Sequence, residues 1–445
     1  MLDYEISKLI RYIYHRYEKF VVFETLKVDN ENFLSYFFVS PKKELVLYNF
    51  ENIKKFFSVL EKYLSLGYYL AGFFSYELGY FLDYKNNKEF CKKKFNFPLA
   101  FFYIFDSPLV FDHKNYKFLG NTKILEDFLK YKNEIKDKKF FITNLNLNVS
   151  KDAYINAIKK IKEYILCGET YQVNYTIKTK FNFSGSLLKF YNFLKQNQKV
   201  SYTAFIKTQK FSILSFSPEL FFRKIDDLII MKPMKGTINR GRNIFEDKLQ
   251  IKKLQNSIKN RAENIMIVDL LRNDLGKISK YAKVETKKLF EVEKYETLFQ
   301  MTSTIQAKID KNISLYKLFK SIFPSGSVTG APKIRTMQII KELEKEDRKV
   351  YTGSIGFFTP KKNAVFNVAI RTALIYKNGK SEMGIGSGIV SDSQPEKEFE
   401  ECKLKSTFLL KKIPKFRLIE TMLYSPKFDK EIKNFDDLKL NITNS

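Results

Sequence analysis

Short apolar runs separated by polar segments dominate the first part of the chain, and this pattern is typical of β-strands. The runs are rich in aromatic and β-branched residues and lie between residues 20 and 111, with one helical segment expected near Asn52–Leu66. A charged stretch, Asn121–Lys138, follows and is either a helix or a linker. We therefore predict a strand-rich N-terminal region, residues 1–140, that packs on the rest of the chain.

A helical repeat of apolar positions appears twice in the second part of the chain. The first helix is predicted over Ser150–Cys167, and Gly168 is a plausible C-cap. The second is predicted as one long helix over Glu246–Leu271, with an apolar stripe formed by Ile251, Leu254, Ile258, Ala262, Ile265 and Asp269. Glu263 lies beside this stripe. If it faces the core, it should meet a cation or a metal, because a buried unpaired carboxylate is costly; a half-exposed glutamate is the alternative.

A β-hairpin is predicted from two apolar runs around a single turn signal. Ser212–Lys224 and Leu228–Lys232 read as its strands, and Asp226 and Asp227 supply the turn chemistry between them. The hairpin carries an acid, Glu219, on one side and leads to a base, Lys235, on the other. A glutamate and a lysine on solvated strands would give the same sequence.

The register of this hairpin decides whether Glu219 and Lys235 can act together. Side chains alternate along a strand, so an odd-membered loop places both on one face of the sheet. A two-residue turn places them on opposite faces unless Pro218 or Gly236 introduces a bulge. A joint role for the two residues therefore predicts an odd loop or a bulge.

The glycine-rich segment Phe323–Lys333 precedes a helix expected over Ile334–Leu343. Pro332 suits the first helical turn, and the glycines let backbone N–H groups approach a ligand. This predicts an anion pocket at a helix N-terminus that suits a carboxylate. The Gly-Lys-Ser/Thr ending of a P-loop is missing, and an ordinary glycine-rich loop fits the pattern equally well.

Charged residues also occur in two segments near the end of the pattern. Arg371 lies in the middle of an apolar strand predicted over Val365–Leu374, so it should have a fixed anionic partner such as a carboxylate. Further on, Glu398, Glu401 and Lys405 share one face of a predicted helix. Two inward carboxylates there could hold a hard divalent cation, and a solvated acidic face is the alternative.

Composition narrows the classes of function. The 445 residues are 44% hydrophobic, enough for a sizeable core, and the net charge of +29 is spread along the chain without a nucleic-acid-binding module. Three cysteines and two histidines are too few for a disulfide framework or a histidine-ligated zinc site, so acid–base chemistry falls to carboxylates and lysines. No apolar stretch is long enough to span a bilayer. We expect a cytoplasmic protein without a membrane or nucleic-acid partner.

Together these segments resemble the chorismate-utilising enzymes, a family that includes anthranilate, aminodeoxychorismate, isochorismate and salicylate synthases. The resemblance covers about residues 20–410 and is carried by the linked motifs AGFFSYE, GETYQVN, SPELF, PMKGT, AENIMIVDLLRND, FPSGSVTGAPK, YTGSIG, VAIRTA, GSGIVSDS and EKEFEECKLK. It implies an α+β fold, with large antiparallel β-sheets packed as a sandwich with flanking helices. It also implies that residues 150–412 form the chorismate-binding catalytic domain.

Two positions distinguish branches of the family. The members that use water as nucleophile have a lysine where this chain has Gln172. Anthranilate synthases have alanine at the position of Lys235, whereas lysine there marks component I of aminodeoxychorismate synthase. The resemblance thus implies amination of chorismate to 4-amino-4-deoxychorismate, toward 4-aminobenzoate and folate. Alternatives are anthranilate synthase component I and, from another class, a basic nucleic-acid-binding scaffold without catalysis.

The resemblance also implies roles for individual residues. Glu219 matches the general acid that protonates the leaving 4-hydroxyl, and Lys235 the nucleophile that attacks C2. Glu263 and Glu401 match ligands of Mg²⁺, with Glu398 as a nearby carboxylate. The positions that match substrate-binding residues are Thr237, Gln300, Ser327, Tyr351, Arg371, Gly386, Gly388 and Lys405.

Some features depart from the family or lie outside its catalytic domain. Gln300 stands where many relatives have histidine, and Asn260 replaces a frequent acid, so altered contacts are expected. The chain lacks the Cys-His pair of a glutaminase, which implies a separate glutamine amidotransferase subunit that supplies ammonia. Residues 413–445, from Phe416 onward, resemble the start of an aminodeoxychorismate lyase domain. They are expected to be a vestige without pyridoxal chemistry or a simple extension.

Overall fold

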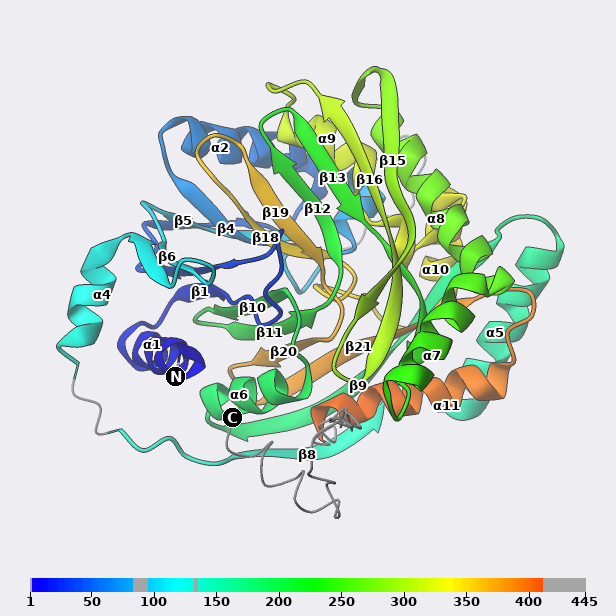
Figure 1. Ribbon diagram of the computed structural model, residues 1–445, viewed down its shortest axis with the longest axis horizontal. Coiled ribbons are helices and arrows are strands. Elements are labelled where there is room, and N and C mark those ends of the chain that lie inside the picture. Colours follow the sequence, from blue (N-terminus) through cyan, green and yellow to red (C-terminus); the bar gives the residue numbers. More distant parts are fainter. Residues whose placement is uncertain (1, 83–94, 132–134, 411–445) are drawn as a thin grey trace, which may run out of the picture.

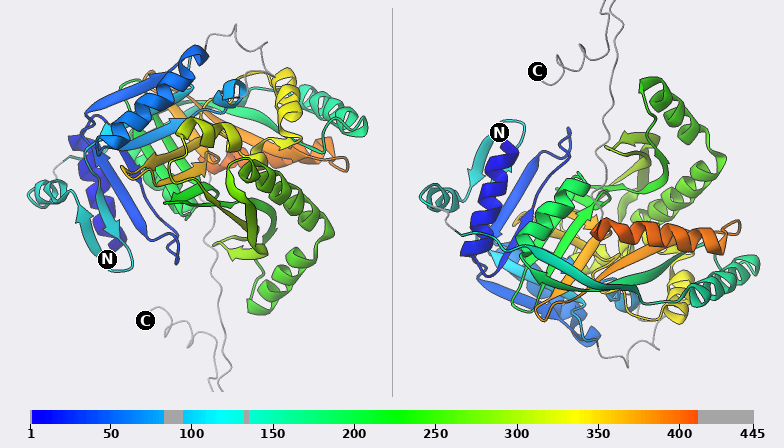
Figure 2. Two further views of the ribbon diagram at one scale, coloured as in Figure 1. Left: turned by 90° about the horizontal axis from the view of Figure 1, so that it is seen from above. Right: turned by 90° about the horizontal axis from the view of Figure 1, so that it is seen from below.

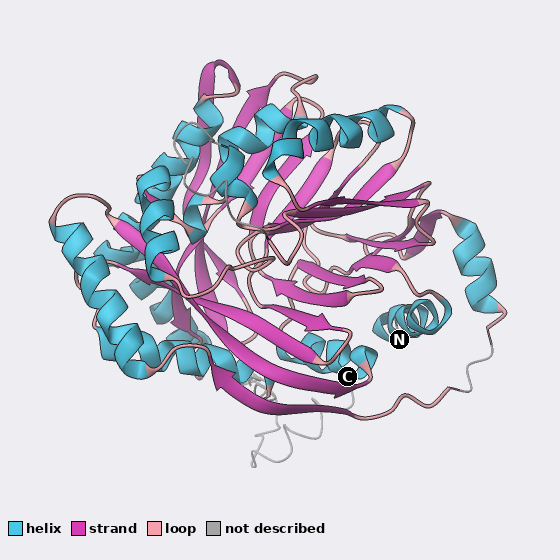
Figure 3. Cartoon of the chain, turned by 180° about the vertical axis from the view of Figure 1, so that it is seen from behind, coloured by secondary structure: helices cyan, strands magenta, loops and turns pink. Residues whose placement is uncertain are grey.

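The computed structural model describes residues 2–82, 95–131 and 135–410, and the chain is organised around two large antiparallel sheets (Figure 1). The tail predicted over residues 413–445 lies outside the described residues. Sheets and helices together give the predicted α+β class (Figure 3). No helix among the described residues is long and apolar enough to cross a membrane.

The first sheet has eleven strands in the order β17–β9–β21–β20–β11–β10–β1–β2–β6–β7, with β8 paired to β9. Its strands are β1 (Phe20–Phe23), β2 (Leu34–Val39), β6 (Leu109–Asp112), β7 (Lys117–Gly120), β8 (Phe140–Leu147), β9 (Gln172–Gly185), β10 (Tyr202–Lys207), β11 (Phe211–Ser217), β17 (Gly330–Ala331), β20 (Thr372–Tyr376) and β21 (Lys380–Ile389).

The second sheet has ten strands in the order β14–β16–β13–β12–β19–β18–β4–β5–β3, with β15 paired to β16. Its strands are β3 (Lys43–Leu47), β4 (Tyr69–Phe74), β5 (Ala100–Phe105), β12 (Leu220–Ile225), β13 (Leu228–Lys232), β14 (Met234–Asn239), β15 (Ser279–Lys294), β16 (Leu298–Ile309), β18 (Ser354–Phe358) and β19 (Ala364–Val368). Strands from the first 140 residues therefore extend both sheets.

The helices surround the two sheets (Figure 2). They are α1 (Leu2–Arg16), α2 (Ile53–Ser65), α3 (Leu78–Leu82), α4 (Thr122–Leu129), α5 (Lys151–Leu166), α6 (Leu187–Asn197), α7 (Ile244–Asn256), α8 (Ile258–Gly276), α9 (Leu315–Ile322), α10 (Lys333–Leu343) and α11 (Pro395–Ser406). The helices predicted near residues 52–66 and 150–167 are present, and the latter ends before Gly168 at a positive φ of 74°. The charged stretch after residue 120 contains α4.

The sheets pack against each other through an aromatic core, as expected for a sandwich. Phe38 of the first sheet lies 5.1 Å from Phe105 and 5.9 Å from Phe357 of the second, measured between ring centroids. On the other side of the second sheet, Phe319 of α9 packs 4.3 Å from Phe74. These rings are almost completely buried, and burial of this kind is the main source of stability in the fold.

Two predicted strands are each divided between the two sheets. The run predicted as one strand over residues 212–224 ends as β11 at Ser217 and resumes as β12 at Leu220 in the other sheet. Pro218 has no backbone N–H to continue the ladder, which explains the break. The strand predicted over residues 365–374 divides in the same way into β19 and β20, and Arg371 lies in the crossing with a positive φ of 52°.

The two crossings run side by side, because β11 pairs with β20 and β12 pairs with β19. The N–H of Val368 donates to the carbonyl of Glu219 at 3.0 Å, and the N–H of Phe216 donates to the carbonyl of Arg371 at 3.0 Å. The predicted acid and the predicted arginine therefore come from neighbouring crossings between the sheets.

The hairpin has the two-residue turn that requires a bulge. Ile225 faces Leu228 across Asp226 and Asp227, and the register shifts between Leu220 and Arg223. A second shift between Met234 and Thr237 accompanies Gly236, whose φ is 87°. A bulge was predicted at Pro218 or Gly236, and the structure has irregularities at Gly236 and within β12.

The long helix predicted over residues 246–271 is two helices. Its break lies at Ser257, whose hydroxyl accepts the N–H of Asn260 at 3.3 Å and caps α8. The predicted apolar stripe is wrong as well, because Ile258 is 86% exposed and Ile265 is 43% exposed. The break changes the phase of the helix, so α8 buries a face that consists of Asn264, Ile267, Val268, Leu271, Asp274 and Leu275.

The apolar run Tyr68–Tyr80, one of the runs between residues 20 and 111 that predict strands, is only partly a strand. It forms β4 only as far as Phe74 and then turns into the short helix α3. This bend brings Tyr76 and Glu77 into the interior, where both are almost completely buried.

Candidate active site

A cavity of about 250 Å³ collects the predicted chemistry. It is lined by both predicted catalytic residues, Glu219 and Lys235, and by all eight positions predicted to bind substrate: Thr237, Gln300, Ser327, Tyr351, Arg371, Gly386, Gly388 and Lys405. These residues come from segments that are far apart in the sequence. Their predicted roles remain predictions, but the structure places them around one space.

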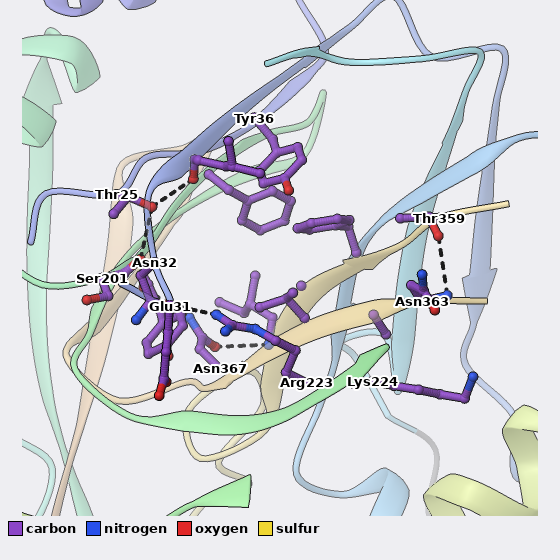
Figure 4. Close-up of a pocket in the computed structure, with 18 of the residues that line it drawn as sticks. Thr25, Glu31, Asn32, Tyr36, Ser201, Arg223, Lys224, Thr359, Asn363 and Asn367 are labelled. Carbon is purple, nitrogen blue, oxygen red and sulfur yellow. Dashed lines mark hydrogen bonds between the residues drawn. The ribbon is translucent and has the colours of Figure 1, made fainter. Parts of the chain in front are cut away.

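A larger cavity of about 360 Å³ lies between the sheets and has a different character (Figure 4). Aromatic and aliphatic side chains line much of it. The guanidinium of Arg223 reaches toward the β1–β2 connection and donates to Oδ1 of Asn32 at 2.6 Å. None of the predicted catalytic or substrate-binding residues lines this cavity. We therefore treat the smaller, more polar cavity as the candidate active site.

Glu219 is held in place through its backbone. Its N–H donates to Oγ of Ser217 at 3.2 Å, and that hydroxyl donates to the carbonyl of Val368 at 2.6 Å. The side chain is 4% exposed, and its Oε1 has no hydrogen-bond partner among the described residues. Burial raises the pKa of Glu219 to about 7, although the Ser327 hydroxyl and the charge of Lys235 act in the opposite direction. Such a carboxyl can donate a proton near neutral pH.

Lys235 projects into the same cavity from β14. Burial lowers its pKa, and the charge of Lys405 adds to this, while Glu263 and Glu219 oppose it. A lowered pKa increases the fraction of neutral amine, the form that acts as a nucleophile. The amine lies against Gly388, since a Cβ at that position would be 3.4 Å from Lys235 Nζ.

Gln172 lies beside Lys235 at the same glycine. A Cβ at position 388 would be 3.3 Å from Gln172 Nε2, and the glutamine is fully buried. Neither polar atom of its amide has a hydrogen-bond partner among the residues that the structure describes. An amide in this state can bind a small polar molecule but cannot remove a proton from water as a lysine could.

Arg371 and Tyr351 form another wall of the cavity. The guanidinium of Arg371 lies 5.6 Å from the ring of Phe408, and burial lowers its pKa. The predicted anionic partner of Arg371 is not found, since the described residues include no ion pair with it. Its fork therefore remains suited to an anionic ligand. Tyr351 is 7% exposed, and its ring packs against Gly384, where a Cβ would clash at 2.1 Å.

The other residues predicted to bind substrate also have defined positions around the cavity. Thr237 and Gln300 face each other across β14 and β16, and the threonine hydroxyl donates to Gln300 Oε1 at 3.1 Å. Lys405 of α11 donates to the carbonyl of Gly386 at 2.9 Å. Ser327 is buried in a short 3₁₀ turn, Gly326–Val328, rather than at the N-terminus of α10, which begins at Lys333.

The three predicted metal ligands lie on α8 and α11 and are not among the residues that line the cavity. Burial raises the pKa of Glu263, and Asp392 and Glu398 add to this effect, whereas Lys235 and Lys259 reduce it. Glu398 Oε1 accepts a hydrogen bond from Ser393 at 2.9 Å, and Glu401 pairs with Lys405 at 2.8 Å. Among the described residues, no three aspartate, glutamate, cysteine or histidine side chains lie together in a group that could hold a metal ion.

Several residues of the site were not predicted. Asn174, Met234, Val328, Ile370, Met383 and Ile385 also line the cavity. Asn174 donates from Nδ2 to the carbonyl of Val328 at 3.1 Å and so joins two walls. Asn174 lies in the motif GETYQVN, so the motif marked the segment without indicating which side chain mattered.

Comparison with known proteins identifies the family of this chain. The sequence profile of the chorismate-binding enzymes matches residues 20–411. The chain belongs to this family. Aminodeoxychorismate synthase component 1 of Escherichia coli (strain K12) is 34% identical over 77% of this chain and 76% of its own length. Anthranilate synthase component 1 of Lactococcus lactis is 32% identical over 71% of this chain and 73% of its own length.

Another relative matches over a shorter part of the chain. Aminodeoxychorismate synthase component 1 of Bacillus subtilis is 37% identical over 58% of this chain, and the match covers 54% of that protein.

Among solved structures, anthranilate synthase component I of Streptococcus pneumoniae has a TM-score of 0.73 at 22% identity and covers 87% of this chain and 94% of its own. This likeness supports the fold of the chorismate-binding enzymes, as predicted from the sequence.

Proposed function

We propose that this chorismate-binding enzyme aminates chorismate to 4-amino-4-deoxychorismate with ammonia from a glutamine amidotransferase subunit. The observation that carries the proposal is the lysine at position 235. It projects into the same cavity as a protonatable Glu219, and its pKa is lowered by burial. An amine in that position provides a nucleophile that the alanine expected in anthranilate synthases does not.

The proposed reaction assigns one proton transfer and two substitutions to these groups. Glu219 gives its proton to the 4-hydroxyl of chorismate, which leaves as water while the neutral amine of Lys235 forms a bond to C2. Ammonia then forms a bond to C4, and the bond between C2 and Lys235 breaks. The fork of Arg371 and the amine of Lys405 provide positive charge for the carboxylates of the substrate.

Mg²⁺ is the proposed cofactor, and the donor chemistry fits it. Glu263, Glu398 and Glu401 offer carboxylate oxygens, the ligands that Mg²⁺ prefers. Glu398 also lies near enough to Glu263 that its charge adds to the raised pKa of the Glu263 carboxyl. When bound, the ion would neutralise carboxylates that otherwise repel a dianionic substrate.

Removal of Mg²⁺ with EDTA is expected to raise the KM for chorismate at least about tenfold. Excess Mg²⁺ should restore it. Glu398→Gln should raise the Mg²⁺ concentration that gives half-maximal activity by about tenfold, because one ligand loses its charge. The matched control is Glu400→Gln, an exposed residue of the same helix that pairs with Lys403 at 3.2 Å. An equal effect of both substitutions would contradict the assignment.

The function is tested by product analysis with chorismate, Mg²⁺ and an ammonium salt. The proposal predicts a product that yields 4-aminobenzoate only after addition of an aminodeoxychorismate lyase. The second candidate is anthranilate synthase component I, because relatives of that name match at similar identity. Anthranilate fluorescence without added lyase would support the second candidate and contradict the first.

A further inference from the structure

Arg348 is a buried arginine that does not line the cavity. It is 2% exposed and follows α10 in the segment that leads to Tyr351. All five of its side-chain N–H groups have acceptors. Nε donates to Glu344, Nη1 donates to the Val328 carbonyl at 2.8 Å and to Thr352 Oγ1 at 3.2 Å, and Nη2 donates to Glu344 at 2.6 Å and to the Asn174 carbonyl. Complete use of the fork fixes the guanidinium in one orientation.

Two of these acceptors belong to walls of the candidate active site. Val328 and Asn174 both line the cavity, and they come from segments more than 150 residues apart, joined also by the Asn174 amide. Val328 directly follows Ser327, which lines the cavity together with Glu219 and whose hydroxyl lowers the pKa of that carboxyl. Arg348 therefore ties the backbone that carries this hydroxyl to strand β9.

The N-terminal region holds Arg348 from the other side. The ring of Tyr76 lies 4.3 Å from the guanidinium, and Glu77 accepts the backbone N–H groups of Arg348 at 2.6 Å and Lys349 at 3.0 Å. Glu344 supplies the counter-charge and also accepts the N–H of Thr176 at 2.8 Å. The segment before Tyr351 is thus fixed at both its backbone and its side chain.

Stability alone does not explain this arrangement. A buried ion pair costs so much desolvation that apolar residues of similar volume are often equally stabilising. Apolar residues could not, however, bind two carbonyls and a hydroxyl in a fixed geometry. Lysine also could not, because it has a point charge in place of the planar fork.

We propose that Arg348 is a positioning residue of the reaction, which fixes the carbonyls of Asn174 and Val328 and, through Val328, the Ser327 hydroxyl beside Glu219. This inference rests on the proposed function. In this role the guanidinium of Arg348 does not touch the substrate, but it connects the N-terminal region to the proton donor, Glu219.

Arg348→Lys tests the inference in the full-length chain. We expect kcat to fall at least tenfold and the alkaline limb of the pH profile of kcat/KM to move to higher pH. The direction follows from Ser327, whose hydroxyl holds the pKa of Glu219 down, so its loss raises that pKa. Lys235, the charged group that faces Glu219, is unchanged. Ser327→Ala should move the limb in the same direction.

The matched control is Lys195→Met, which removes a buried ion pair with Glu24 that lies outside the cavity. We expect it to lower Tm without moving the pH limb or the KM. If Arg348→Lys keeps the wild-type kcat and pH limb, or only lowers Tm as the control does, the inference is overturned. If Arg348→Lys does not fold, Thr352→Val removes one acceptor and keeps the ion pair. It should give a smaller shift in the same direction, and no shift would overturn the inference.

Calorimetric binding of chorismate with Mg²⁺ separates this inference from the proposed function. If the wild type produces no aminodeoxychorismate, the proposed function fails. In that case Arg348→Lys should still bind chorismate at least about fivefold more weakly than the wild type. The reason is that the hydrogen bonds that join the two cavity walls at Asn174 and Val328 are lost. Equal affinity would then overturn the positioning role.

Discussion

Lys235→Ala is expected to lower kcat for the amination of chorismate by about 10⁴-fold or more, the scale seen when a covalent nucleophile is removed. Chorismate should still bind within a few-fold of its wild-type affinity, because Arg371 and Lys405 remain in the cavity. The measurement is single-turnover formation of the lyase-dependent product, together with calorimetric binding of chorismate. Intact mass analysis without ammonia should detect a chorismate-derived adduct on the wild type and none on the variant.

Lys232→Ala is the control for this experiment. Lys232 lies three residues earlier on β13, pairs with Glu293 at 3.0 Å and does not line the cavity. Its loss should leave kcat within about twofold, as expected for a residue away from the chemistry. Undiminished amination by Lys235→Ala, with the same product, would rule out the covalent role.

Glu219→Gln is expected to lower kcat by about 10³-fold, the usual contribution of a general acid. Glutamine preserves the size of the side chain but has no proton to transfer to the leaving hydroxyl. Wild-type kcat/KM should fall as pH rises through about 7, where Glu219 loses its proton, and this limb should vanish in the variant. The measurement is a pH profile of both proteins. A limb that persists unchanged in Glu219→Gln would assign it to another group.

The same substitution should also change how stability depends on pH. The pKa of Glu219 is raised in the folded state, so its contribution to stability is fully present below its ordinary pKa and is lost as pH rises through about 7. The wild type should therefore lose stability between pH 6 and pH 8 relative to Glu219→Gln. Thermal unfolding of both proteins at these two pH values measures the difference. The control Glu400→Gln removes an exposed carboxyl and should follow the wild type.

The sequence predicted the segments of this site better than their paths through the fold. The period-two pattern around Asp226 required a bulge if Glu219 and Lys235 were to act together, and the structure has a two-residue turn with bulges. The same pattern could not show that the strands cross between sheets at Pro218 and Arg371. The alternation of apolar residues continues in the strand before a crossing and in the strand after it. Periodicity alone therefore predicts one continuous strand.

Other misses have equally local causes. Ser257 looks like an ordinary polar residue within a helical pattern, yet its hydroxyl caps α8 and changes which face is buried. Arg348 could not be recognised from the sequence, because its acceptors are backbone carbonyls brought together only by the fold. Long-range contacts between charged side chains and the backbone leave no periodic signal.

The paired crossings have a consequence for motion within the molecule. Glu219 and Arg371 lie on adjacent ribbons that are joined by reciprocal backbone hydrogen bonds, and each ribbon continues into both sheets. If the two sheets slide or tilt against each other, both crossings should bend together as one hinge. We therefore expect relative motion of the sheets to widen or narrow the cavity, while the distance between Glu219 and Arg371 stays constant.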